Sequence, residues 1–83
     1  MQEREESTLQ LREGEGLEAW LDQYGDQLLR LCTLYLKDVH LAEDAVQDTF
    51  LKAWRSREQF RGESSAKTWL TRIAINVCKG YLR

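Results

Sequence analysis

Apolar residues recur every three or four positions along most of the chain, which is the spacing of one face of an α-helix. The first such run predicts a helix from Leu17 that ends near Lys37–Asp38. Gly25 interrupts the run, but one glycine costs a helix only about 1 kcal/mol relative to alanine, so we expect the helix to continue through it. The apolar positions of this helix are Leu17, Trp20, Leu21, Tyr24, Leu28, Leu31, Cys32 and Tyr35.

A second helical run begins near His40–Leu41 and fades around Glu58–Phe60. This start places Glu43 in the first turn, where the helix dipole favours an acidic side chain. Trp54 lies at the border of the apolar face. The residues expected to be buried on that face are Ala42, Ala45, Val46, Thr49, Phe50 and Ala53.

A third helix follows the one clear loop, residues 61–65 (RGESS), which contains a glycine and two serines that could cap a helix. We expect this helix to begin at Ala66 or Lys67, with a core stripe of Leu70, Ile73, Ala74, Val77 and Tyr81. The polar residues 1–16 are expected to form a flexible N-terminal arm, and residues 17–83 the folded domain. The predicted fold class is therefore all-α, a small bundle of three main helices.

The composition supports this fold class. The 83 residues suit one small domain, and the absence of proline together with only five glycines leaves too few turn residues for a β-sandwich or barrel. No apolar run is long enough to cross a bilayer, and the acidic first residues do not resemble a signal peptide. The expected compartment is the cytoplasm.

Charge is distributed very unevenly along the chain. Residues 1–51 carry four basic and twelve acidic side chains, a net charge of −8, whereas residues 52–83 carry eight basic and two acidic side chains, a net charge of +6. The basic segment is either a surface for a polyanion such as nucleic acid or a solvated surface that attracts the acidic half of the same domain.

Enzymatic chemistry and a metal site find little support. Cys32 and Cys78 suit reduced core residues of a cytoplasmic protein, although they could form one disulfide. A zinc site would need more ligands than His40, the only histidine, can complete. Asp44 and Asp48 form a carboxylate pair without an acid–base partner, so we expect neither an enzyme nor a cofactor.

The outward face of the second predicted helix contains one unusual residue. Leu51 stands in the middle of an otherwise polar arc, opposite the apolar face. An apolar residue ringed by polar ones is typical of a protein interface, but it is also compatible with plain surface. The arc consists of Asp44, Gln47, Asp48, Leu51, Arg55 and Glu58.

The third predicted helix has a second stripe beside its core stripe. Its members recur at intervals of three or four, and Phe60, Arg61 and the loop precede them. Cations attract phosphates, aromatic rings stack on bases and an amide reads base edges, so the set favours single-stranded nucleic acid. Considered alone, Trp69 is better explained as a core residue. The stripe consists of Trp69, Arg72, Asn76, Lys79 and Arg83.

Two adjacent segments resemble a known family. Residues 42–54 (AEDAVQDTFLKAW) resemble the polymerase-binding segment of extracytoplasmic-function (ECF) sigma factors, and residues 60–65 with 68–76 (FRGESS and TWLTRIAIN) resemble the promoter-melting segment of the same family. The two segments have the family's order and spacing, and the resemblance extends over about Leu17 to Arg83. Ala66 and Lys67 occupy positions that are often aromatic or apolar in relatives.

The resemblance implies a domain of a bacterial alternative sigma factor. Such a domain docks on the β′ clamp helices of core RNA polymerase, captures the non-template strand of the −10 promoter element with one base flipped into a pocket, and melts the DNA. The resemblance implies an anti-sigma factor as a further partner. A membrane would be involved only through that partner. No small-molecule substrate is implied. The family's second domain, which reads the −35 element, is absent from these 83 residues, so we expect a fragment of a longer protein.

The resemblance also assigns the candidate site residues. Those implied to face the polymerase are Asp44, Gln47, Asp48, Leu51 and Arg55. Phe60 and residues 61–65 would shape the base pocket, and Arg72 and Asn76 would lie at the upstream edge of the melted region. The full set implied to face DNA is Phe60, Arg61, Gly62, Glu63, Ser64, Ser65, Lys67, Trp69, Arg72, Asn76, Lys79 and Arg83.

Two other functions remain as alternatives from the residues themselves. One is a helical protein–protein interaction module that does not bind nucleic acid. The other is a helix-turn-helix that reads the major groove, which fits less well because aromatic residues and a pocket-like loop precede the basic stripe.

Overall fold

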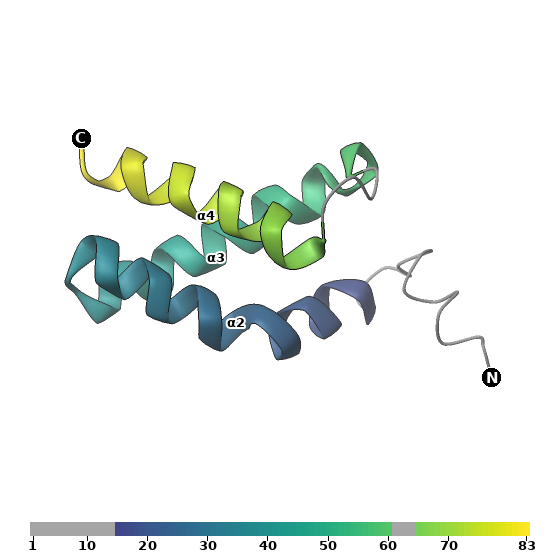
Figure 1. Ribbon diagram of the computed structural model, residues 1–83, viewed down its shortest axis with the longest axis horizontal. Coiled ribbons are helices and arrows are strands. Elements are labelled where there is room, and N and C mark those ends of the chain that lie inside the picture. The colour runs from purple at the N-terminus through teal and green to yellow at the C-terminus, as the bar shows by residue number, and fades with distance from the viewer. Residues whose placement is uncertain (1–14, 61–64) are drawn as a thin grey trace.

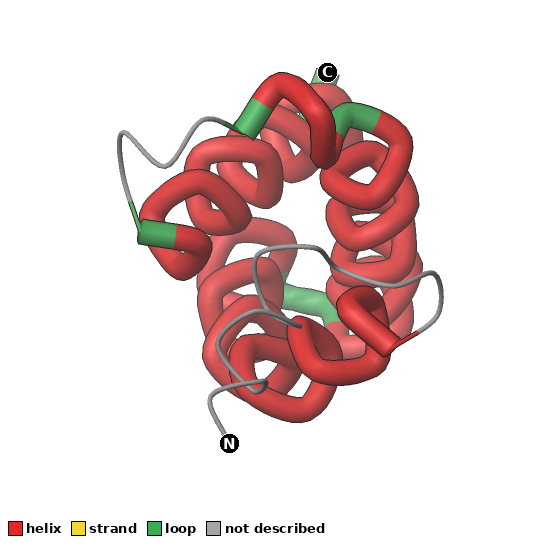
Figure 2. The backbone as a smooth tube through the Cα atoms, turned by 90° about the vertical axis from the view of Figure 1, so that its right-hand side faces the viewer, coloured by secondary structure: helices red, strands yellow, loops and turns green. Residues whose placement is uncertain are grey.

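The computed structural model describes residues 15–60 and 65–83, which form three long helices and one short one (Figure 1). These are α2 (Glu15–Leu36), α3 (Val39–Arg55), the 3₁₀ helix η1 (Arg57–Gln59) and α4 (Ala66–Tyr81). Successive long helices run in opposite directions, and the end view in Figure 2 shows them arranged around a common interior. The prediction of a small all-α bundle with three main helices is confirmed.

The predicted arm and most of the predicted loop lie outside this part of the chain. Residues 1–14 and 61–64 are not among those described, and Glu15 and Gly16, expected in the arm, already belong to α2. Gly25 lies within α2, which continues through it as expected.

The turn between α2 and α3 is fixed by two adjacent residues. Lys37 adopts a left-handed conformation, with φ of 58°, and its backbone N–H donates to the Thr33 carbonyl at 2.7 Å. Asp38 then caps α3, because its Oδ1 accepts from the backbone N–H groups of His40 at 2.8 Å and Leu41 at 3.0 Å. The predicted start at His40–Leu41 was slightly late, and Glu43 lies beyond the first turn. Asp38 is the acidic residue at this helix end.

The start of α4 agrees with the sequence. Ser65 is the N-cap residue, and its Oγ accepts from the backbone N–H of Thr68 at 3.1 Å. The helix begins at Ala66, one of the two predicted positions. One of the two serines proposed as caps therefore has that role.

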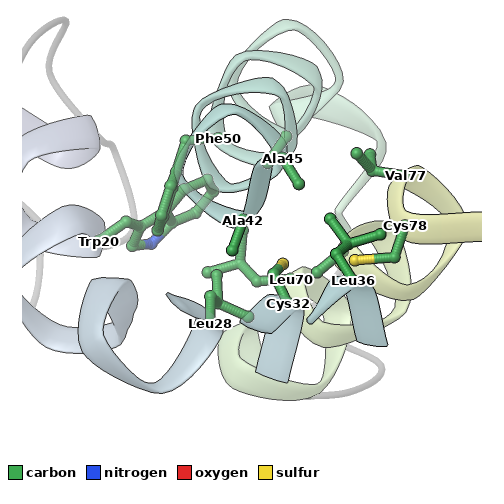
Figure 3. Packing of buried hydrophobic residues seen from close by; sticks show 12 residues of the cluster. Trp20, Leu28, Cys32, Leu36, Ala42, Ala45, Phe50, Leu70, Val77 and Cys78 are labelled. Carbon is green, nitrogen blue, oxygen red and sulfur yellow. The ribbon is translucent and has the colours of Figure 1, made fainter. Parts of the chain in front are cut away.

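The core is built from side chains that all three long helices direct inward (Figure 3). α3 contacts both α2 and α4, and alanines dominate its buried face. Thr49 is completely buried beside them, and its hydroxyl donates to the Ala45 carbonyl at 2.7 Å, so no polar atom is left unpaired there. The buried apolar residues are Trp20, Leu28, Cys32, Leu36, Ala42, Ala45, Phe50, Ala53, Leu70, Ala74, Val77 and Cys78.

Tyr81, predicted for a core stripe, is exposed, as are two apolar positions of the first predicted helix, Leu21 and Tyr35. Leu21 is 42%, Tyr35 38% and Tyr81 36% exposed, while Leu36, which was not among the predicted apolar positions of its helix, is buried. Leu36 is buried because the chain reverses directly after it and α3 folds back over the end of α2. Tyr81 is exposed because it lies in the last turn of α4, where its ring reaches the surface.

Both cysteines are free thiols with no exposed surface, as their interpretation as reduced core residues predicts. Burial, followed by the neighbouring Cys78, raises the pKa of Cys32 to about 12. Cys32 therefore remains a neutral thiol at physiological pH and packs as a small apolar residue. Within the described helices, none is long and apolar enough to span a membrane.

We expect Leu70→Ala to lower the free energy of unfolding by about 2–5 kcal/mol, because Leu70 is fully buried where α4 meets the core. Leu34→Ala is the matched control. Leu34 is 74% exposed, so its truncation should change the free energy of unfolding by less than about 0.5 kcal/mol. Urea unfolding followed by circular dichroism measures both, and equal losses would show that the helices pack in another register.

Candidate functional site

Four of the six residues predicted for the outward arc are exposed residues of α3. Asp44, Gln47 and Arg55 are exposed, and Leu51 is 49% exposed although it is an aliphatic residue in the middle of the helix. Glu58 does not belong to the arc, because α3 ends at Arg55 and Glu58 lies in η1. The helical phase that separates Leu51 from the core is confirmed.

Asp48, the fourth polar member of the arc, is held by a residue of another helix. The Tyr81 hydroxyl donates to Asp48 Oδ2 at 2.9 Å, across 33 residues of sequence. This bond, with desolvation and the negative charges of Asp48 and Asp44 adding to it, raises the pKa of Tyr81 to about 12. Asp48 is therefore half-buried and oriented by α4 rather than free in solvent.

A groove runs between α3 and α4 beside this hydrogen bond. The volume of the groove is about 730 Å³. Both Arg55, which was predicted to face the polymerase, and Asn76, which was predicted to face DNA, line it. The two predicted surfaces are thus adjacent along this groove. The lining residues are Asp48, Lys52, Arg55, Ser56, Ile73, Asn76, Val77, Gly80 and Tyr81.

The basic stripe of α4 is exposed apart from its aromatic member. Trp69 is half-buried, and its ring stacks on Phe60 with centroids 4.9 Å apart and planes 26° from parallel. It also meets Trp20 edge-on at 5.9 Å, so part of its surface belongs to the core, as the alternative interpretation proposed. The exposed members of the predicted DNA surface in α4 are Lys67, Arg72, Asn76 and Lys79, followed by Arg83.

Trp20 continues the aromatic contacts into α3. Its ring meets Trp54 edge-on at 6.1 Å, and the Arg57 guanidinium lies 4.1 Å from the centre of the Trp54 ring. Arg57 also donates from Nη1 to the Trp54 carbonyl at 2.6 Å, which fixes the cation over the ring. The aromatic cluster, defined as Phe60, Trp69, Trp20 and Trp54, therefore joins α2, α3 and α4 at the end of the bundle where residues 61–64 connect η1 to α4.

Residues 18–83 match the Sigma-70 region 2 family. The chain belongs to this family. Over 60 residues the region 2 domain is 47% identical to an ECF RNA polymerase sigma factor, SigG, of Mycobacterium tuberculosis, a match that covers 72% of this chain and 16% of that protein. Over 62 residues it is 45% identical to an ECF RNA polymerase sigma-E factor of Haemophilus influenzae, covering 75% of this chain and 32% of that protein.

A third relative, an RNA polymerase sigma-H factor of Pseudomonas aeruginosa, is 42% identical over 60 residues, or 72% of this chain and 31% of that protein. The region 2 domain thus corresponds to a third or less of the length of these relatives. No solved structure matches the chain. The family match includes both segments on which the resemblance was based.

Several residues of the site were missed by sequence reasoning. Lys52, Ser56 and Gly80 line the groove, and Arg57 packs on Trp54, but none of them was singled out as a candidate. Helical periodicity would have placed Lys52 beside Arg55 on the second helix, but only the crossing of α3 and α4 shows that both border one groove. Four predicted pocket residues, Arg61, Gly62, Glu63 and Ser64, lie outside the described residues, and their role stays a prediction.

The hydrogen bond between Tyr81 and Asp48 predicts a measurable titration. In a Tyr24→Phe/Tyr35→Phe background, the remaining phenol should ionise near pH 12, where an unperturbed tyrosine ionises near pH 10. Asp48→Asn removes the negative charge that opposes ionisation and should lower the pKa of Tyr81 toward 10. Ultraviolet absorbance of the phenolate measures the change.

Asp44→Asn is the matched control for this titration. Asp44 acts on Tyr81 only through its charge and without a hydrogen bond, so its removal should lower the pKa by less than Asp48→Asn does. If both variants lower it equally, the hydrogen bond does not dominate.

Proposed function

We propose that this domain binds core RNA polymerase and captures the non-template strand of the −10 promoter element, which melts the promoter. The observation that supports this most directly is the placement of two exposed surfaces of different chemistry on one bundle. The arc around Leu51 belongs to α3, and the cationic stripe belongs to α4. Membership of the Sigma-70 region 2 family supplies the context in which both surfaces have partners.

The arc of α3 suits a protein partner, proposed here to be the β′ clamp helices. Leu51 offers apolar surface at the centre of a patch whose neighbours Asp44 and Gln47 are polar and exposed. Interfaces are built in this way, with an apolar anchor that is desolvated and a polar rim that sets orientation. We propose an anti-sigma factor as a further partner. We also propose that the domain acts in the cytoplasm and has no enzymatic activity.

The stripe of α4 suits a nucleic-acid strand. Arg72, Lys79 and Arg83 provide exposed positive charge, which attracts phosphate, and Asn76 provides an amide that can donate to and accept from a base edge. Phe60 lies at the start of the proposed base pocket, completed by residues 61–65, and Arg72 and Asn76 are assigned to the upstream edge of the melted region. A strand already separated from its partner offers unstacked bases to such a surface.

We expect Leu51→Ala to weaken binding to core RNA polymerase by about 1–2 kcal/mol, because truncation of an interface anchor has a cost of that order. The melting temperature should stay unchanged, since Leu51 points away from the core. A titration of labelled domain with polymerase measures the affinity, and Leu34→Ala on α2 is the control. Equal affinities for the wild type and Leu51→Ala would remove the arc from the interface, and a large fall in melting temperature would show that Leu51 is structural.

Asn76→Ala and Lys79→Ala should have different effects on binding to a single-stranded −10 oligonucleotide. Removing the Lys79 cation should weaken binding to all sequences alike and reduce the slope of log K against log salt by about 0.7. Removing the Asn76 amide should leave that slope nearly unchanged and erase preference at one base position, at about 1–3 kcal/mol. Oligonucleotides that vary one base at a time, measured at two salt concentrations, separate the two effects.

The same experiment tests the proposed division of roles. If both variants show the same loss for every sequence, Asn76 does not read a base. If the wild type binds these oligonucleotides no better than duplex and without salt dependence, the domain is a protein-interaction module.

A further inference from the structure

The groove between α3 and α4 is lined by polar and basic residues of both helices, so it belongs neither to the predicted polymerase surface alone nor to the predicted DNA surface alone. Lys52 and Arg55 lie three residues apart on one side of α3, and Ser56 caps that helix next to them. Asn76, one turn before Gly80, forms part of the facing wall on α4. A guanidinium, an ammonium, a hydroxyl and an amide thus border one opening of about 730 Å³.

The two cations of this groove are available to a ligand. Across residues 15–60 and 65–83, no carboxylate forms an ion pair with Lys52 or Arg55. Asp48 is the single acidic residue in the lining, and one of its carboxylate oxygens already accepts the Tyr81 hydroxyl at one edge of the groove. The lining therefore has a net positive charge, and its donors match phosphate oxygens.

Gly80 lines the groove without contributing a side chain. A Cβ atom at this position would meet no atom within 4 Å, so packing does not require a glycine there. Gly80 lies within α4 and its φ is not in the left-handed region, so no left-handed conformation requires a glycine either. A glycine weakens a helix relative to alanine, and here it leaves open space at the Cβ position of a residue that lines the groove.

We propose that this groove holds the sugar–phosphate backbone of the bound DNA strand, with Lys52 and Arg55 of α3 contacting its phosphates. The inference rests on the proposed function and deepens it. It moves Arg55 from the polymerase surface, where the family resemblance placed it, to the DNA surface, and it adds Lys52, which was not a candidate.

Continuity with the stripe of α4 favours a DNA strand over an acidic peptide. Asn76 belongs both to that stripe and to the wall of the groove, and the exposed cation Lys79 is the neighbour of Gly80. Because Asn76 itself borders the opening, a strand that contacts Arg72 and Asn76 already lies at the edge of the groove. A backbone that continues along α4 therefore enters the groove, with α3 contributing the second row of cations.

The first test neutralises the α3 cations. The double variant Lys52→Gln/Arg55→Gln should bind a fluorescent single-stranded −10 oligonucleotide more weakly, with a salt slope reduced by about 1.4, since each lost contact to a single strand removes about 0.7. The loss should be the same for every base sequence. Arg30→Gln on α2, an exposed cation away from the groove, should leave both quantities unchanged.

The second test uses Gly80 to change the charge of the groove while leaving the cations in place. Relative to Gly80→Gln, an uncharged variant of similar size, Gly80→Glu should bind at least tenfold more weakly, and Gly80→Lys should bind more tightly. The Cβ that all three variants add meets no atom within 4 Å, and circular dichroism checks that each variant folds.

The outcomes separate this inference from the proposed function. If the wild type does not bind the oligonucleotide, the proposed function fails and the groove assignment fails with it. If the wild type binds but the salt slope of Lys52→Gln/Arg55→Gln is unchanged, the groove assignment alone is wrong. Weakened binding to core polymerase by this double variant, with DNA binding intact, would also overturn it and identify an acidic segment of the polymerase as the occupant.

Discussion

The close approach of α3 to both of its neighbours is the constraint on which the rest of the structure depends. Ala42, Ala45 and Ala53 are completely buried, and the single polar residue on this face, Thr49, satisfies its hydroxyl within its own helix. Side chains this small allow α2 and α4 to pack against α3 at short distances, and close-packed cores tolerate added volume poorly. Larger residues at these positions would push one of the neighbouring helices away and change the direction of every side chain on α3.

Because α3 is held from two sides, its outward residues have fixed directions. Leu51, Asp44 and Gln47 face solvent as one arc, while Asp48, Lys52 and Arg55 border the groove toward α4. Tyr81 connects the two helices through Asp48, so the position of that carboxylate depends on both. The arc and the cationic stripe are therefore parts of one rigid arrangement.

Sequence periodicity predicts the three helices, the buried face of α3 and the exposure of Leu51 because each of these depends on residues close together in the chain. The start of α3 was misplaced because the side chain of Asp38, rather than the dipole acting on Glu43, determines where the helix begins. Periodicity assigns Tyr81 to the core stripe, but it does not show where the core ends along the helix. The groove and the aromatic cluster require the crossing of helices distant in sequence, so neither is visible in the spacing of residues along one helix.

All three tryptophans of the chain, Trp20, Trp54 and Trp69, belong to one cluster at one end of the bundle. Their ring centres lie about 6 Å apart in succession, close enough for an excitation absorbed by one indole to pass to another before light is emitted. The ultraviolet fluorescence of this protein consequently reports on a single site, next to the segment that joins η1 to α4. The opposite end, where Lys37 and Asp38 turn the chain, has no intrinsic tryptophan probe.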